Sequence, residues 1–333
     1  MTRRRASLAS VPLGEDLPVA VMGILNVSPE SFHPDSIHMS REALFGAAHR
    51  MVEAGAVLLD VGARSTAPYR SADPDEDEER RRLGAAVEWL AGKVSVPLSA
   101  DTTRAGPARA ALEAGAAVIN DVSGLRDPRL AELVAEHRAG LILVATPVAA
   151  RPDSTVGGLI QERRGSVGAG AARPDSTVGG LIQERRGFEA PDRCFPVHRV
   201  RELLREAMER ARRAGIAEER VVLDPGIGFF RDEAVPWDEW DIRVLAGLAA
   251  LHDLGRPLCV GVSRKSFVAA LTGSTSPAER LAGSLAATTI AVLHGAALVR
   301  THDVPETRDA IRVVERLRRA TMAQTMRNEA SGS

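Results

Sequence analysis

The chain alternates between short apolar runs and longer amphipathic stretches, and this alternation persists from Val19 almost to the C-terminus. The apolar runs are rich in Val, Ile and Leu and lie at 19–25, 56–61, 96–101, 117–121, 140–145, 220–224, 257–262 and 296–301. Segments with helical spacing lie at 40–54, 78–92, 104–114, 127–138, 196–215, 239–253, 278–294 and 304–321. Apolar strands that are each followed by a helix are typical of a parallel sheet covered by helices. Eight such units predict an α/β fold, a closed (β/α)8 TIM barrel, with a doubly wound open sheet as the alternative.

One stretch interrupts this rhythm. The segment AARPDSTVGGLIQERRG at 149–165 is repeated at 171–187. Two copies are too few for a stacked repeat architecture, so we interpret 147–190 as a duplicated insertion in the loop after the fifth strand. It is either a functional lid or a neutral expansion. The predicted organisation is an N-terminal tail at 1–17, one barrel domain at 18–321 and a C-terminal tail at 322–333.

Composition excludes several classes of protein. The 333 residues carry 43 Lys and Arg against 44 Asp and Glu, and aromatic residues are 3% of the chain, so neither a basic surface nor stacking platforms for nucleic acid are expected. The two cysteines, Cys194 and Cys259, cannot form a disulfide framework and favour a cytoplasmic protein. The uncharged run at 281–299 changes from helical to strand-like spacing, so we predict a buried helix and strand rather than a membrane span.

Polar residues recur where the predicted strands end. In a parallel barrel the carboxyl ends of the strands form one face, and active sites of such barrels lie there. All predicted strands except the fifth bring a charged, amide or imidazole side chain to this face, from Asn26, Asp60, Asp101, Asn120, Asp121, Asp224, Arg264, Lys265, Arg300, His302 and Asp303. Each residue alone could be a cap or a turn residue, because such roles are common where strands lead into helices. Seven such ends together indicate a functional face.

The charges at this face are of both signs. Asp101, Asn120 and Asp224 can accept hydrogen bonds from a flat heterocycle that bears N–H groups. The cationic candidates follow the seventh and eighth strands, where barrels often bind phosphate; they are Arg264, Lys265, Arg300 and His302. A planar, donor-rich ring that carries a phosphate group would satisfy both sets. Asp303 precedes Val-Pro-Glu and is predicted to cap the last helix.

Six segments, in this order along the chain, resemble the dihydropteroate synthase family. They are MGILNVSPESF at 22–32, SADT at 99–102, INDV at 119–122, DPGIGF at 224–229, SRKS at 263–266 and RTHDV at 300–304. The similarity covers roughly 18–318 outside the insertion. It implies the same barrel as the alternation, usually as a homodimer with Mg²⁺. The implied reaction joins 6-hydroxymethyl-7,8-dihydropterin diphosphate to p-aminobenzoate, with release of diphosphate.

The resemblance also implies roles for individual residues. Asp101, Asn120 and Asp224 would hold the pterin ring, with Lys265 and Gly261 completing that pocket. Asn26, Arg300 and His302 would bind the diphosphate, and Asn26 would also contact Mg²⁺. Phe229, Lys265 and Ser266 would border the aryl-amine site, and Thr66 and Val122 are further substrate-binding residues. Lys265, Asp101, Asp224 and His302 are the catalytic candidates, acting through charge and without a covalent intermediate.

Two positions depart from the family pattern. The second loop has Ala67 where the family usually has Arg, with Arg64 and Arg70 nearby, and Ala145-Thr146 replaces a His-Met pair after the fifth strand. The spellings SPESF and STAP are similar to a divergent branch more familiar in archaea. These departures leave the aryl amine and the response to sulfonamides open. The alternatives are a synthase for a modified aryl amine, as in methanopterin-type cofactors, and a non-catalytic pterin-binding or methyltransferase-type barrel. In each case the partners are small molecules, with neither nucleic acid nor membrane.

Overall fold

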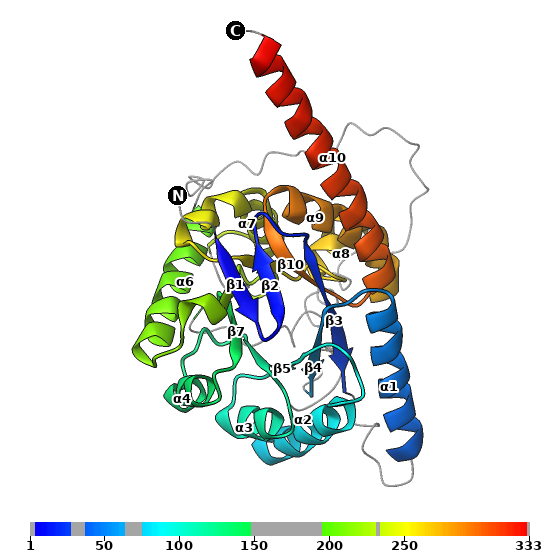
Figure 1. The fold of residues 1–333 in the computed structure, drawn as a ribbon, viewed down its shortest axis with the longest axis vertical. Helices are drawn as coiled ribbons and strands as arrows, with labels where there is room; N and C mark the ends of the chain where they lie inside the picture. The colour runs from blue at the N-terminus through cyan, green and yellow to red at the C-terminus, as the bar shows by residue number, and fades with distance from the viewer. Residues whose placement is uncertain (1–3, 28–36, 64–74, 148–194, 231–233, 332–333) are drawn as a thin grey trace, which may run out of the picture.

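The computed structural model describes residues 4–27, 37–63, 75–147, 195–230 and 234–331. Eight parallel strands close into a barrel in the order β10-β3-β4-β5-β6-β7-β8-β9 (Figure 1). The strands are β3 (Ala20–Asn26), β4 (Leu58–Gly62), β5 (Leu98–Asp101), β6 (Val118–Asp121), β7 (Gly140–Val144), β8 (Val221–Asp224), β9 (Leu258–Val260) and β10 (Ala296–Thr301). All eight lie where the sequence predicts them, so the closed barrel is confirmed and the open sheet is excluded.

The helices form a layer around this barrel (Figure 1). They are α1 (Ile37–Glu53), α2 (Glu76–Leu90), α3 (Ala105–Glu113), α4 (Pro128–Glu136), α6 (Phe195–Arg213), α7 (Trp237–Ala246), α8 (Ser266–Thr272), α9 (Leu281–Leu293) and α10 (Val304–Ser331). Three 3-10 segments, η2 (Glu218–Arg220), η3 (Leu248–Leu254) and η4 (Pro277–Arg280), complete the described elements. Among the helices that the structure describes, the short helix α8 is the one that the sequence pattern does not predict. Its seven residues are too few to display a helical period.

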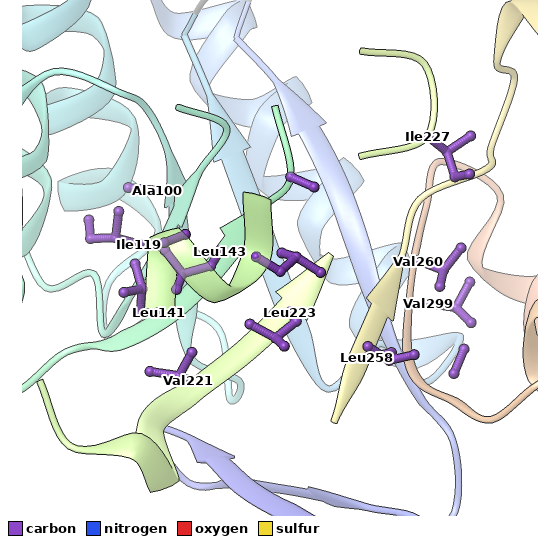
Figure 2. Packing of buried hydrophobic residues seen from close by; sticks show 14 of the residues in the cluster. Ala100, Ile119, Leu141, Leu143, Val221, Leu223, Ile227, Leu258, Val260 and Val299 are labelled. Atoms are coloured by element: carbon purple, nitrogen blue, oxygen red, sulfur yellow. The ribbon is translucent and has the colours of Figure 1, made fainter. Parts of the chain in front are cut away.

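Alternate strand residues face the helices and form the main hydrophobic core. Successive side chains of a strand point to opposite faces, so every second residue of each strand enters this layer. Figure 2 shows part of it along neighbouring strands, including Ile119, Leu141, Leu223, Leu258 and Val299. Because the intervening residues are also buried, the strands appear as continuous apolar runs in the sequence.

A second apolar cluster fills the amino-terminal half of the barrel interior. Its strand members are Ala20, Met22, Leu58, Val118, Ile142, Val222, Cys259 and Leu298. The segment expected to be a tail covers this end: β1 (Arg5–Leu8) and β2 (Val11–Gly14) pair as an antiparallel hairpin. Leu8 and Leu13 of the hairpin are fully buried in the cluster. The expectation of a tail at 1–17 is therefore wrong for 5–14, because alternate hairpin residues close the bottom of the barrel.

The C-terminal segment also differs from its expectation. Helix α10 continues to Ser331 and extends beyond the barrel (Figure 1), so the predicted tail at 322–333 is helical over most of its length. The run at 281–299 forms α9 and most of β10, as predicted. Within the described residues, no helix has the length and apolarity needed to cross a membrane. The duplicated insertion at 147–190 lies outside the described residues except for its first residue.

Candidate active site

Arg300 lies at the centre of the polar face. It comes from the end of β10, and its side chain points into the barrel mouth, where its Nε lies 2.6 Å from Asp60 Oδ2. A second guanidinium nitrogen, Nη2, lies 2.8 Å from Asp101 Oδ2. Burial lowers the pKa of Arg300, but the charges of Asp60 and Asp101 outweigh burial and raise that pKa overall. Arg300 is therefore a fixed cation held between two carboxylates on neighbouring strands.

Asn120 joins the same cluster from β6. Its Nδ2 donates to Asp60 Oδ2 at 3.0 Å, so Asp60 accepts from both Asn120 and Arg300 through one oxygen. Asp60 is fully buried and Asn120 is 3% exposed. Three strand ends that are far apart in sequence thus meet through hydrogen bonds. The predicted convergence of Asp101, Asn120 and Arg300 is present in the structure.

Asp224 reaches the site from the end of β8. Burial raises the pKa of Asp224, and the N–H of Gly226 and the charges of Lys265 and Arg300 offset part of that rise. The following loop depends on glycine, because Gly226 has a φ of +73° and a Cβ there would lie 1.9 Å from the carbonyl oxygen of Ala145. Gly228 donates its N–H to Asp241 Oδ1 at 2.8 Å, which fixes the loop against α7.

Lys265 lies just before α8 and approaches the Asp224 loop. Its Nζ is 5.0 Å from the centroid of the Phe229 ring, within the range of a cation–π contact. A Cβ on Gly228 would lie 3.1 Å from the same Nζ, so the glycine provides room for the lysine. The charge of Lys265 lowers the pKa of the Asp224 carboxyl group, against the effect of burial. Ser266 follows as the buried first residue of α8.

His302 is neutral at the mouth of the barrel. Burial lowers its pKa to about 4, and the nearby charges of Arg300, Arg264 and Lys265 contribute to this lowering. Its Nδ1 lies 3.0 Å from Ser263 Oγ, and its backbone N–H donates to the same oxygen at 3.2 Å. On sequence grounds, His302 is one of the predicted cations. The structure makes it a neutral hydrogen-bonding group held by the loop after β9.

Three residues of the polar face have structural partners instead. Arg264 has a φ of +59° and donates from two nitrogens to both carboxylate oxygens of Asp303. The Asp303 carboxylate therefore pairs with Arg264 and does not form the predicted side-chain cap of α10. Asp121 accepts from the N–H and Oγ of Ser123 at 2.9 and 2.7 Å, which makes it a turn residue on the outer side of β6.

The remaining predicted residues lie around the mouth. Asn26 is exposed at the end of β3, and its Oδ1 lies 3.7 Å from the position that a Cβ on Gly62 would occupy. Gly261 follows β9 and would contact Arg300 through a Cβ at 3.7 Å. Val122 is half-buried, and its carbonyl accepts from Thr146 Oγ1 at 2.6 Å. Thr66, Arg64, Ala67 and Arg70 lie outside the described residues.

The donor set at the mouth limits how a divalent cation could be held there. Within the described part of the chain, no group of three or more His, Cys, Asp or Glu side chains could hold a metal ion. Mg²⁺ commonly keeps several waters and binds through one or two protein oxygens plus substrate phosphates. The exposed Asn26 amide at the mouth fits an ion of that kind, carried by the diphosphate.

Asp60 is a predicted strand end that is not among the predicted site residues. Its signal was a carboxylate at an inward-facing position inside an apolar strand, two residues before Gly62. Glu79 is not predicted from the sequence either; it is fully buried on α2 and accepts from Arg104 Nη1 at 2.9 Å. That pair ties α2 to the loop after β5.

Comparisons with known proteins agree with this geometry. Residues 22–302 match the family model described as pterin binding enzyme. The dihydropteroate synthase of Escherichia coli K12 is 35% identical over 295 residues, which are 89% of this chain and 90% of that protein. A probable bifunctional folylpolyglutamate synthase/dihydropteroate synthase of Halobacterium salinarum is 37% identical over 305 residues, 92% of this chain and 32% of that protein.

Solved structures give the same result. Xanthomonas albilineans dihydropteroate synthase with 4-aminobenzoic acid superposes with a TM-score of 0.73 at 34% identity, over 95% of this chain and 99% of that one. The same enzyme in complex with 7,8-dihydropteroate gives a TM-score of 0.71 at 33% identity, over 94% and 98% of the two chains. The bacterial and archaeal relatives are similarly distant, so these identities do not assign the chain to an archaeal branch.

Proposed function

This chain belongs to the pterin-binding enzyme family as a dihydropteroate synthase, and we propose how its residues divide the work of that reaction. The enzyme joins 6-hydroxymethyl-7,8-dihydropterin diphosphate to p-aminobenzoate and releases diphosphate. The observation that carries the residue roles is the cluster of Asp60, Asp101, Asn120 and Arg300, in which acceptors for a ring and a cation for an anion meet at one mouth.

The acids hold the pterin ring. The N–H groups of a pterin match carboxylate and amide oxygens, and Asn120 Oδ1 is buried without a hydrogen-bond partner in the described structure. Asp101 at the end of β5 accepts a hydrogen bond from Arg300, and the charge of Arg300 also acts on Asp224 at the end of β8. Positive charge develops on the ring system as the methylene–oxygen bond breaks, and these carboxylates stabilise it. The aryl amine then attacks the methylene carbon and loses a proton.

The leaving diphosphate takes up the electrons of the broken bond. Arg300 supplies a permanent positive charge, and Lys265 adds a second one beside Asp224. Neutral His302 contributes as a hydrogen-bond donor: in the tautomer in which Ser263 Oγ donates to its Nδ1, the proton is on Nε2. Because these groups are held before substrate binds, little reorganisation is needed as charge moves.

Mg²⁺ is the proposed metal, with Asn26 as its protein contact. When bound, the ion would neutralise charge on the diphosphate oxygens. Chelation should therefore lower turnover and weaken diphosphate binding, while leaving binding of a pterin without phosphates unchanged.

The test of the activity is direct. Purified protein is incubated with Mg²⁺, the pterin diphosphate and a panel of aryl amines, and both diphosphate release and the condensed product are measured. Dihydropteroate formation with p-aminobenzoate preferred supports the proposal. A preference for a modified aryl amine would support the methanopterin-type alternative instead. Equal affinity for the pterin with and without its diphosphate, and no turnover, would favour a non-catalytic barrel.

The lysine content offers a sharper test of the site. The chain has only two lysines, Lys265 at the mouth and exposed Lys93 between α2 and β5, at the other end of the barrel. Reductive methylation followed by mass spectrometry reports on both lysines in one sample. The pterin diphosphate should protect Lys265 and leave Lys93 reactive. Equal labelling of both lysines with saturating substrate would contradict the proposed position of Lys265.

We also propose a cytoplasmic homodimer. Exposed apolar side chains lie on the neighbouring helices α8, α9 and α10; they are Leu271, Ile290, Leu293, Val313 and Leu317. Such a patch is typical of an interface between subunits. Cys259 is a free, buried thiol, which accords with a reducing compartment. Light scattering of the wild type and of Leu293→Asp would test the dimer, and cell fractionation the location.

A further inference from the structure

We propose that Asp60 is a positioning residue that couples the ring-binding and diphosphate-binding halves of the site. This inference rests on the proposed function, because it concerns how the two halves are held for the same reaction. Asp60 acts through Asn120 and Arg300 rather than by touching the reacting atoms.

The contacts of Asp60 carry the argument. Its Oδ2 accepts from Arg300 Nε at 2.6 Å and from Asn120 Nδ2 at 3.0 Å. The structure has no hydrogen bond between Arg300 and Asn120 themselves among the residues that it describes. One carboxylate oxygen is therefore the link between the proposed diphosphate cation and the proposed ring amide.

The depth of Asp60 explains why its role is indirect. In the sheet register Asp60 lies beside Ile24 and Ser99, whereas Gly62 lies beside Asn26 and Asp101 at the mouth. Asp60 is thus one inward-facing position deeper than the residues proposed to meet the substrate. Gly62 has no side chain, and a Cβ there would lie 3.7 Å from Asn26 Oδ1 and 3.8 Å from Asp101 Oδ2. Asp60 forms the floor below this space.

Asp60 also affects how strongly Arg300 pairs with Asp101. Without a carboxylate at Nε, the charge of Arg300 would be balanced by Asp101 alone, and the stronger pairing would withdraw Asp101 from the ring. With Asp60 fully buried beneath it, Arg300 is balanced from below, and Asp101 remains 26% exposed at the side chain. A buried charge that loses its partner is strongly destabilised, so this arrangement is held firmly.

Unused hydrogen-bonding capacity around Asp60 gives an independent sign. Asp60 Oδ1, Ser99 Oγ and Asn120 Oδ1 are buried and have no partner among the described residues. Buried polar atoms without partners are uncommon in proteins and often mark functional positions. The three residues lie on adjacent strands β4, β5 and β6, on the side of the sheet that faces the site. Asn120 Oδ1 is available to the ring, whereas Asp60 Oδ1 and Ser99 Oγ lie one position deeper, below the ligand.

The first test uses Asp60→Asn, which keeps the shape and removes the charge. Asn120→Ala should weaken binding of 6-hydroxymethylpterin, and Arg300→Lys should weaken binding of inorganic diphosphate. Asp60→Asn should weaken both about tenfold in calorimetry, although Asp60 contacts neither ligand. At saturating pterin diphosphate, kcat should fall and the KM for p-aminobenzoate should stay within twofold of wild type. If both affinities are unchanged in folded Asp60→Asn, the proposal is wrong.

Asp121→Asn is the matched control. Asp121 is also fully buried, ends the next strand but one, and faces the opposite side of the sheet. The Asp121→Asn substitution should lower the midpoint of thermal unfolding without changing the affinity for 6-hydroxymethylpterin or for inorganic diphosphate. Equal losses of ligand affinity in both variants would mean that a buried charge is needed only for folding, which would overturn the coupling role.

A second measurement keeps the proposal falsifiable if Asp60→Asn does not fold. Asn120→Ala and Arg300→Lys are combined, and the affinity for the pterin diphosphate is measured for the two single variants and the double variant. If Asp60 couples the two residues, the fold loss of affinity in the double variant should be at least five times smaller than the product of the two single losses. Additive losses would count against the coupling. If wild type binds the pterin diphosphate but makes no product, the proposed function fails while this binding test still stands.

Discussion

The two ends of the barrel interior use the same strands for opposite purposes. On four of the strands, an apolar inward-facing residue in the lower half is followed two positions further along by a polar one. The pairs are Leu58 and Asp60 on β4, Val118 and Asn120 on β6, Val222 and Asp224 on β8, and Leu298 and Arg300 on β10. The lower end is closed by the β1–β2 hairpin, and the upper end faces the mouth. A displacement of two residues therefore separates stability from chemistry.

This comparison shows how the barrel tolerates its charged site. Buried carboxylates and an arginine at the mouth are costly unless they are paired and hydrogen-bonded. The apolar layer below supplies stability that does not depend on those charges. Substitutions at the lower end should consequently change folding without changing turnover. Substitutions at the upper end should change ligand binding or turnover, and should change stability only where a buried charge is altered.

The largest expected effect is at the lower end. Leu8→Ala removes a fully buried side chain of the hairpin and leaves a cavity against the barrel floor. It should lower the free energy of unfolding by about 3 to 5 kcal/mol. Urea denaturation measures this loss, and kcat and KM below the transition should match wild type. A changed KM in the folded variant would show that the two ends are not separate.

The next effect is at the upper end. Lys265→Ala removes a charge beside Asp224 and Phe229. It should lower kcat/KM about 100-fold, which corresponds to roughly 2.7 kcal/mol, while the unfolding free energy changes by less than about 0.5 kcal/mol. Lys93→Ala, at the other end of the barrel, is the matched control and should have wild-type kinetics. Equal rates for both variants would remove Lys265 from the mechanism.

A third effect depends on pH. His302 has a pKa of about 4 in the folded protein, below the usual value near 6.5 of an unfolded histidine. The unfolded chain therefore takes up the proton first, and stability falls as pH decreases from 6.5 towards 4. At pH 5 this contribution is a loss of about 2 kcal/mol relative to pH 7.5. His302→Gln should lose correspondingly less stability over that range in urea denaturation. If the stability of the two proteins depended on pH in the same way, the pKa of His302 would not be lowered in the folded protein.

Much of this fold was predictable because its strands are buried on both faces. Each strand appears as an apolar run, and a polar residue marks where it reaches the mouth, as Asp101 and Asp224 show. The hairpin was not predictable in the same way. Each of its strands has four residues, and Pro12 and Gly14 in β2 resemble the signals of an irregular segment.

Side-chain partners were the harder part of the site. Arg264 and Asp303 lie 39 positions apart, in the loops that follow the paired strands β9 and β10. The neutral state of His302 follows from burial among cations, which no linear pattern records. Asp60 was visible as a strand end, but its two donors come from β6 and β10. Sequence patterns therefore predicted which residues gather at the mouth better than what each one does there.

The smallest expected effects come from two strand glycines, one at each end of the barrel. A Cβ on Gly140 would lie 3.0 Å from Leu8 Cδ2 and 3.2 Å from Val118 Cγ2, so Gly140→Ala pushes against the hairpin. It should lower the unfolding free energy by about 1 kcal/mol with unchanged kinetics.

A Cβ on Gly62 meets nothing closer than 3.7 Å, so Gly62→Ala should leave stability within about 0.5 kcal/mol. Its methyl group would occupy the space above Asp60 and raise the KM for the pterin diphosphate about fivefold, roughly 1 kcal/mol. Thermal unfolding and steady-state kinetics on both variants decide the matter, because a stability loss in Gly62→Ala with an unchanged KM would place that glycine with the lower end.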